Sequence, residues 1–187
     1  MYLCSIKFNT MKSINIFVLI TIACFQVSAQ TAEKVKWYTI EEALKLNATA
    51  PRKIIMDIYT DWCGWCKKMD AETFDHPVIA RYINKNFYPV KFDAESSTPI
   101  KFGDQTFVNQ GVGGARKSTH QFATALGVSG YPAVAYFTGD LKLIGVVPGF
   151  LTAEQIEPLL HFIVQEKYQS ISLEEYQKTF VSELKGK

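Results

Sequence analysis

The stretch Trp62–Cys66, with the sequence WCGWC, places two thiols three positions apart. It follows the apolar run Ile54–Tyr59, which reads as a buried strand. It precedes residues 67–72, which read as the body of a helix. We therefore expect a dithiol on the first turn of a helix behind a central strand, an arrangement that suits disulfide exchange.

The position of each cysteine in that helix predicts its role. The thiolate is the nucleophile in disulfide exchange, and a free cysteine near pH 7 is mostly thiol. Unpaired N–H groups at a helix N-terminus stabilise an anion, so we expect Cys63 to be the activated, exposed nucleophile. Cys66 lies one turn further in, where we expect a more buried resolving thiol that frees the product from the mixed disulfide.

Other uses of a CxxC pair fit this sequence less well. Zinc usually needs four ligands, and the histidines His76, His120 and His161 are scattered without ligand spacing. Covalent haem attachment needs a histidine directly after the second cysteine, where the chain has Lys67. We therefore expect no metal and no cofactor, and a permanently closed structural disulfide stays as the alternative.

Composition predicts a single folded domain of neutral charge. The chain has 187 residues, of which 48% are hydrophobic and 20% charged, enough for a sizeable core. Of the 20 Lys and Arg residues, Lys7 and Lys12 precede Gln30, which leaves 18 to balance the 18 Asp and Glu. This balance gives no indication of a nucleic-acid partner.

Residues 1–29 have the pattern of an export signal peptide. Lys12 supplies the positive charge, and the apolar run over 14–25 is too short for a confident membrane span. Val27-Ser28-Ala29 forms a small-residue cleavage site. We therefore predict a mature domain over 30–187 in the periplasm or another extracytoplasmic compartment.

Other interpretations of this leader stay open. It could remain as an uncleaved anchor, or Cys24 could carry a lipid, although Thr21 stands where lipoprotein signals usually have leucine. Met11 could be the true start. If cleavage occurs, Cys4 and Cys24 are lost and the mature chain keeps only the CxxC pair, which favours a redox role in an oxidising compartment.

The remaining sequence alternates between helix and strand patterns. We predict strands over 53–60, 87–93, 133–138 and 141–147, and helices that open at 37–44 and run over 64–73, 76–86, 119–126, 153–167 and 173–184.

Polar residues mark the start of most of these helices. Three pairs have capping-box spacing: Thr39 with Glu42, Thr152 with Gln155, and Ser172 with Glu175. We also expect Asp75 and Ser118 to cap the helices over 76–86 and 119–126, the second closed by Gly127.

This order of elements predicts an α/β fold with a mixed central sheet and helices on both faces. Residues 94–117 fit no element and read as a loop-like insertion, either a lid or specificity loop beside the site or a decoration. We expect the tail over 168–187 to pack on the sheet.

Three features of the chain resemble the thioredoxin superfamily over about residues 35–167. The WCxxC motif directly follows a strand, and Asp57 lies six positions before Cys63, where thioredoxins carry a buried carboxylate. Tyr131–Pro132 precedes the hairpin, where the superfamily has its cis-proline. Residues 66–74 look more like exported bacterial thioredoxin-like proteins, among them the carboxy-terminal domain of the membrane disulfide-reductant transporter, than like cytosolic thioredoxin.

The resemblance implies a thioredoxin fold and further site residues. Asp57 would be the buried general base for Cys66, because a carboxylate in an apolar strand has a raised pKa; a hydrogen-bonded core aspartate is the alternative. Pro132 in cis and Tyr131 would line a substrate groove.

The motif itself would supply the rest of that groove through Trp62, Gly64 and Trp65. We expect Trp62 to pack with an exposed edge. Trp65 would be a surface aromatic that meets partners or a packing residue. It stands where thioredoxin has proline and many oxidants have histidine, so the direction of exchange stays open.

These patterns together predict a thiol–disulfide oxidoreductase of the bacterial cell envelope that reduces protein disulfides. We expect a monomer that is re-reduced by an electron donor in the membrane. The alternatives are a disulfide oxidase or isomerase, and a redox-inert peptide-binding module. Both thiols, Asp57 and Pro132 are present together, which argues against the inert module.

Overall fold

The computed structural model describes residues 33–111 and 118–184. The predicted signal peptide and its cleavage site lie outside these ranges. Of the helices inside them, none has the length and apolar character needed to cross a bilayer.

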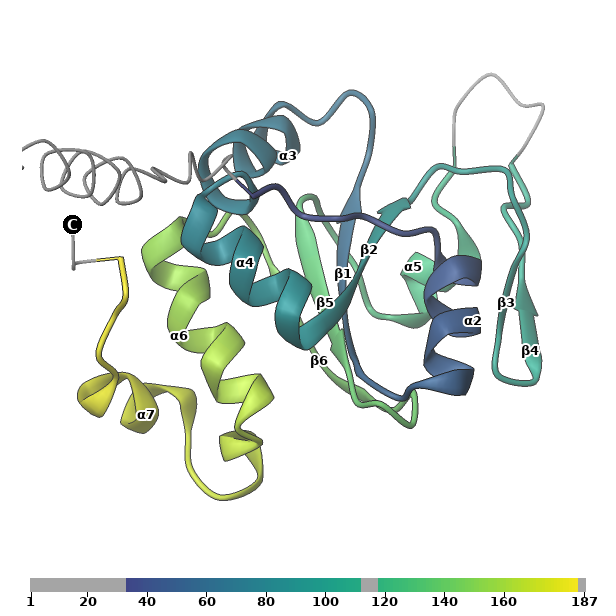
Figure 1. Cartoon of the computed structure of the whole chain (residues 1–187). Helices are drawn as coiled ribbons and strands as arrows, with labels where there is room; N and C mark the ends of the chain where they lie inside the picture. The colour runs from purple at the N-terminus through teal and green to yellow at the C-terminus, as the bar shows by residue number, and fades with distance from the viewer. Residues whose placement is uncertain (1–32, 112–117, 185–187) are drawn as a thin grey trace, which may run out of the picture. The chain divides into compact units, whose positions relative to one another are not determined.

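Four strands of the described residues form a mixed sheet in the order β2-β1-β5-β6 (Figure 1). β1 (Lys53–Tyr59) runs parallel to β2 (Phe87–Asp93) and antiparallel to β5 (Ala133–Phe137), and β5 pairs antiparallel with β6 (Leu143–Pro148). A strand with neighbours on both edges and helices on both faces is almost continuously apolar, as β1 is. The predicted strands and the fold class are confirmed, although β6 begins two residues later than expected.

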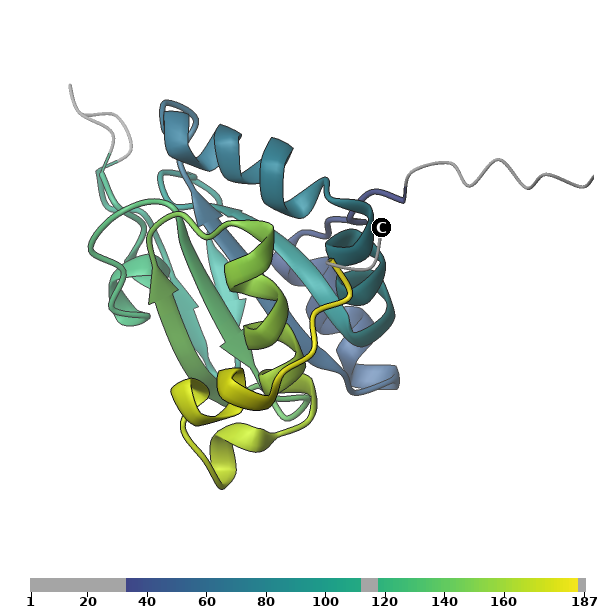
Figure 2. The same cartoon turned by 90° about the vertical axis from the view of Figure 1, so that its left-hand side faces the viewer.

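Helices cover both faces of this sheet (Figures 1 and 2). α4 (Pro77–Asn86) and α6 (Ala153–Val164) share a core with Ile55 of β1, whereas α2 (Ile40–Thr49) and α5 (Gln121–Ala125) lie over the opposite face. Successive side chains of a strand point to opposite faces, so Asp57 shares the face of Ile55.

The helix predicted over 64–73 consists of two parts. α3 (Gly64–Met69) continues into a π-helical turn, η1 (Asp70–Phe74), in which the N–H of Asp75 donates to the carbonyl of Asp70. π-turns are rare and occur often at functional sites. This turn buries Thr73 and Phe74 while it leaves Asp70 beside β2.

Three of the five predicted helix caps are present. The boxes at Thr39 and Thr152 are present, and the Ser172 hydroxyl accepts the N–H of Glu175. The caps predicted at Asp75 and Ser118 are wrong.

Histidines occupy those two cap positions. The Nδ1 atoms of His76 and His120 accept the N–H groups of Val78 and Phe122, at 3.3 and 3.0 Å. The residues expected as caps are engaged elsewhere: Asp75 pairs with Lys34, and Ser118 donates to Asn109.

The prediction that residues 94–117 form only a loop is wrong for the part of this insertion that the structure describes. Residues 112–117 lie outside the described residues. The described part holds an antiparallel hairpin of β3 (Ile100–Phe102) and β4 (Gln105–Phe107). Gly103, with φ +60°, makes the turn. Ile100 is buried, and the half-buried Phe102 and Phe107 pack against Phe122 of α5. These tertiary contacts stabilise two strands that are too short to give a periodic signal.

The C-terminal segment packs on α6 rather than on the sheet, because α4 and α6 already cover that face (Figure 2). A single turn, η2 (Lys167–Gln169), leads to α7 (Leu173–Thr179), which ends five residues earlier than predicted. Beyond α7, the buried carboxylate of Glu157 accepts the Ser182 hydroxyl and the N–H of Glu183. The tail is thus part of the folded unit.

Candidate active site

Cys63 and Cys66 form a disulfide at the start of α3, with an S–S distance of 2.17 Å. Cys63 is the N-cap residue of the helix, and its Sγ accepts the N–H of Cys66 at 3.1 Å. Its own N–H donates to the carbonyl of Thr60, directly after β1. The predicted placement of a cysteine pair on the first turn behind the central strand is therefore confirmed.

Both cysteines are buried, with 4% of Cys63 and 2% of Cys66 exposed. The predicted order holds, but the expectation of an openly exposed Cys63 is wrong. The reason is geometric, since the bond to Cys66 and the accepted N–H turn the Cys63 sulfur toward the helix. A substrate must therefore approach closely to reach this sulfur.

Asp57 lies in the middle of β1 and is only 1% exposed. Its Oδ2 accepts a hydrogen bond from the Nζ of Lys91 at 2.5 Å. Burial raises the pKa of Asp57 to about 6, although the nearby Lys91 ammonium acts in the opposite direction. A carboxyl group with this pKa can exchange a proton near neutrality.

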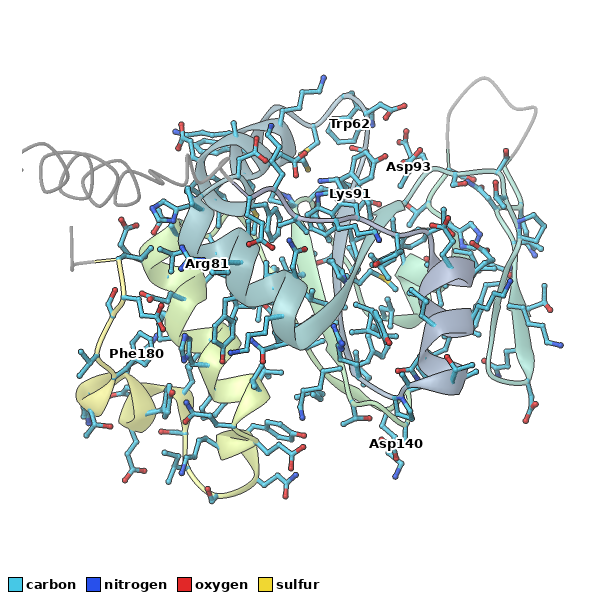
Figure 3. All side chains as sticks on the ribbon, in the orientation of Figure 1. Trp62, Arg81, Lys91, Asp93, Asp140 and Phe180 are labelled. Atoms are coloured by element: carbon cyan, nitrogen blue, oxygen red, sulfur yellow. A yellow bond between two sulfur atoms is a disulfide. The ribbon has the colours of Figure 1, made fainter. Side chains whose placement is uncertain are left out.

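Lys91 was missed by the sequence analysis. It stands on β2 directly opposite Asp57 in the parallel register of β1 and β2. The sequence does show a lysine inside the otherwise apolar run of β2. That this lysine pairs with Asp57 follows only from the register of β1 and β2. Figure 3 shows Lys91 and Trp62 toward the same end of the sheet.

Lys91 also binds the carboxylate of Asp70, the first residue of η1. Burial lowers the pKa of Lys91, but the carboxylates of Asp57 and Asp70 outweigh this effect and hold that pKa above its usual value. The N–H of Asp70 donates to the carbonyl of Cys66. A continuous set of contacts thus joins the buried acid of β1 to the helical turn that follows Cys66.

Three aromatic rings surround the Lys91 ammonium. Its Nζ lies 4.9 Å from the ring centroid of Trp37, 5.0 Å from that of Tyr59 and 5.8 Å from that of Phe74. Ring faces attract cations, so these contacts stabilise the charged form of a partly buried lysine.

The peptide bond between Tyr131 and Pro132 is cis, as predicted. The carbonyl of Pro132 accepts the N–H of Gly149 at 2.8 Å, which joins the proline loop to the end of β6. The ring of Tyr131 meets the ring of Trp62 edge-on at 6.2 Å. The proline loop therefore contacts Trp62, the residue directly before Cys63.

Trp62 and Trp65 are, within the described residues, the aromatic side chains with the greatest exposure, at 66% and 59%. The indole N–H of Trp62 donates to Oε1 of Glu95 at 3.0 Å. Gly64, between the two tryptophans, is exposed, and open space lies where a side chain would begin. The cysteine pair is thus flanked by exposed apolar surface. The described residues hold no cluster of three or more His, Cys, Asp or Glu side chains suited to a metal.

The chain belongs to the family described as thioredoxin-like domain, whose model matches residues 40–163. Over 112 residues it is 25% identical to the thiol:disulfide interchange protein DsbD of Pectobacterium atrosepticum, a match that covers 59% of this chain and 16% of DsbD. Over 85 residues it is 29% identical to an uncharacterized protein of Archaeoglobus fulgidus, covering 45% of this chain and 67% of that protein. This chain spans about one sixth of the length of DsbD.

Solved structures share the fold. A DsbH oxidoreductase has a TM-score of 0.53 at 18% identity, covering 74% of this chain and 92% of that chain. A putative disulphide-isomerase from Bacteroides thetaiotaomicron has a TM-score of 0.52 at 22% identity, covering 76% and 99%. The predicted thioredoxin fold is therefore confirmed. Family membership and the Cys63–Cys66 pair together support thiol–disulfide oxidoreductase activity.

The arrangement around Lys91 predicts two opposite changes in the pKa of Asp57. Lys91→Met removes the attracting charge and should raise that pKa above 6 by about one pH unit or more. Asp70→Asn removes a like charge and should lower it. The measurement is an NMR titration of the Asp57 carboxyl carbon in the oxidised protein.

Glu72→Gln is the matched control, since Glu72 also lies on η1 but pairs with Lys68, and it should leave the titration of Asp57 unchanged. A lower pKa of Asp57 in the Lys91→Met protein would contradict the assigned interaction.

Proposed function

We propose that this chain is a thiol–disulfide oxidoreductase of the bacterial cell envelope that reduces protein disulfides. The observation that carries the proposal is the Cys63–Cys66 disulfide at the start of α3. Trp62, directly before Cys63, contacts Tyr131 of the cis Tyr131–Pro132 bond. The match to part of a thiol:disulfide interchange protein supports the same chemistry. The predicted signal peptide supports the location, and the monomeric state stays a prediction.

The reaction needs two exchange steps. The Cys63 thiolate attacks one sulfur of the substrate disulfide, so a bond forms between Cys63 and that sulfur while the other substrate sulfur leaves as a thiolate. The Cys66 thiol then loses its proton, attacks the Cys63 sulfur and closes the Cys63–Cys66 disulfide, and the second substrate thiolate leaves. Two electrons pass from the dithiol to the substrate, whose thiolates take up two protons.

Asp57 is proposed as the base that receives the Cys66 proton. With a pKa of about 6 it is mostly ionised at neutral pH and can accept a proton there. Its position on the face of the sheet under α3 and its contact with Lys91 support this role, because Lys91 also binds the turn that follows Cys66.

The presence of this base favours reduction over oxidation. A group that activates Cys66 accelerates release of the reduced product, which is the second step of a reductase. The closed Cys63–Cys66 disulfide must then be opened by a donor dithiol, and we propose a membrane protein as that donor.

Single cysteine variants test the assignment of the two sulfurs. Cys63→Ser should abolish the reduction of insulin disulfides, measured as turbidity of the released B chain, because no nucleophile remains. Cys66→Ala should instead trap substrates as mixed disulfides on Cys63, visible on non-reducing gels and released by dithiothreitol. The double variant with both changes is the control and should trap nothing.

Full insulin reduction by the Cys63→Ser protein would contradict the role of Cys63 as the nucleophile. No insulin reduction by the unchanged protein, together with intact partner binding by the Cys63→Ser protein, would contradict the enzymatic proposal and favour a redox-inert binding module. The absence of dithiothreitol-sensitive adducts on the Cys66→Ala protein would contradict the resolving role of Cys66.

Removal of the base should change the pH dependence of resolution. Asp57→Asn should slow the decay of the mixed disulfide about tenfold or more at pH 7, but much less at pH 9, where the Cys66 thiol ionises without help. Single-turnover kinetics with a peptide disulfide would measure this decay. A pH–rate profile identical to that of the unchanged protein would remove Asp57 from the mechanism.

A further inference from the structure

We propose that Trp65, Phe150 and Lys68, the aromatic–lysine cluster, bind an acidic side chain next to the disulfide cysteine of the substrate. The inference rests on the proposed function and names the substrate class that the site prefers, namely extended polypeptide segments in which Asp or Glu neighbours the cysteine.

The cluster is an exposed aromatic pair with a cation held over it. The ring centroids of Trp65 and Phe150 lie 5.5 Å apart. The Nζ of Lys68 is 5.2 Å from the Trp65 centroid and 5.5 Å from the Phe150 centroid. Trp65 and Lys68 remain open to solvent, since 59% of Trp65 and 45% of the Lys68 side chain are exposed.

Two hydrogen bonds fix the Phe150 side of the cluster next to the disulfide. Gly149, just before Phe150, donates its N–H to the carbonyl of Pro132. The carbonyl of Leu151, just after it, accepts the Thr73 hydroxyl of η1 at 2.6 Å. Phe150 is therefore tied both to the proline loop and to the helix that carries the cysteines. A segment that lies along the Tyr131–Pro132 loop with its cysteine at Cys63 passes this cluster.

The charge of Lys68 is available to a ligand. Its carboxylate partner Glu72 is four residues away on an exposed surface, at a distance of 3.7 Å. Exposed pairs of this kind contribute little, so a substrate carboxylate can compete with Glu72. The ring faces hold the ammonium in place, which reduces the entropy lost when a carboxylate binds.

Trp62 differs from Trp65, because its indole N–H donates to the carboxylate of Glu95 and no lysine lies over its ring in the described residues. A bound segment therefore meets a cation on the Trp65 side, where an acidic residue is favoured and a basic residue disfavoured. The aliphatic part of a glutamate side chain can also contact the two rings at the cluster.

Two series of disulfide-bonded peptides test the inference with the full-length reduced protein. One series places Glu, Gln or Lys directly before the reactive cysteine, and the other places them directly after it. In one of the series we expect kcat/KM to be about tenfold higher for Glu than for Lys, with the difference mainly in KM. Lys68→Gln should reduce that preference to about twofold or less, and Lys68→Glu should reverse it.

Lys67→Gln is the matched control, because Lys67 is an exposed neighbour on the same helix, and it should keep the preference. Equal kcat/KM for Glu and Lys peptides in both series, or a full preference in the Lys68→Gln protein, would overturn the inference while leaving the proposed function intact. A reduced protein that acts neither on the peptides nor on the neutral hydroxyethyl disulfide would contradict the proposed function, and the inference with it.

Discussion

The contact of Lys91 with two carboxylates is the interaction on which the site depends. A carboxylate inside a sheet loses its hydration, and this cost is tolerable only when a partner stabilises the ionised form or when the group takes up a proton. Both effects act on Asp57: burial raises its pKa and favours the protonated form, whereas Lys91 stabilises the ionised form. The same lysine holds Asp70, so the π-turn after α3 is tied to β2. The protonation of Asp57 and the packing of the helix that carries Cys66 thus depend on one cation.

The remaining contacts of the site hold the surroundings of the disulfide in place. Hydrogen bonds run from Gly149 to Pro132, from Thr73 to Leu151 and from Trp62 to Glu95, and they join segments that are far apart in sequence. Trp62 and Trp65 are exposed next to the two buried cysteines. The Cys63–Cys66 disulfide is thus held in place while the exposed aromatic rings beside it are free to contact a partner, as proposed for a protein that acts on polypeptide chains.

Local sequence signals predicted the parts of the molecule that depend on local physics. The strand before the WCGWC motif, the boxes at Thr39 and Thr152 and the cis bond before Pro132 were all expected from short stretches of sequence, the last through a family resemblance. What sequence reasoning missed depends on contacts between distant segments. Lys91 acquires its role only when β1 and β2 are in register, and the β3–β4 hairpin is stabilised by aromatic packing beneath α5. Histidine caps were missed because Ser, Thr, Asp and Asn are the usual residues at that position.

The reduction potential of the Cys63–Cys66 pair tests the central claim most directly. Equilibration of the purified protein in dithiothreitol or glutathione buffers, followed by alkylation of the free thiols, gives this value. The account predicts a potential near about −270 mV, as in thioredoxin, because the protein is proposed to donate electrons to substrate disulfides. A potential near about −120 mV, as in strong oxidants, would contradict the account and make the protein a donor of disulfides.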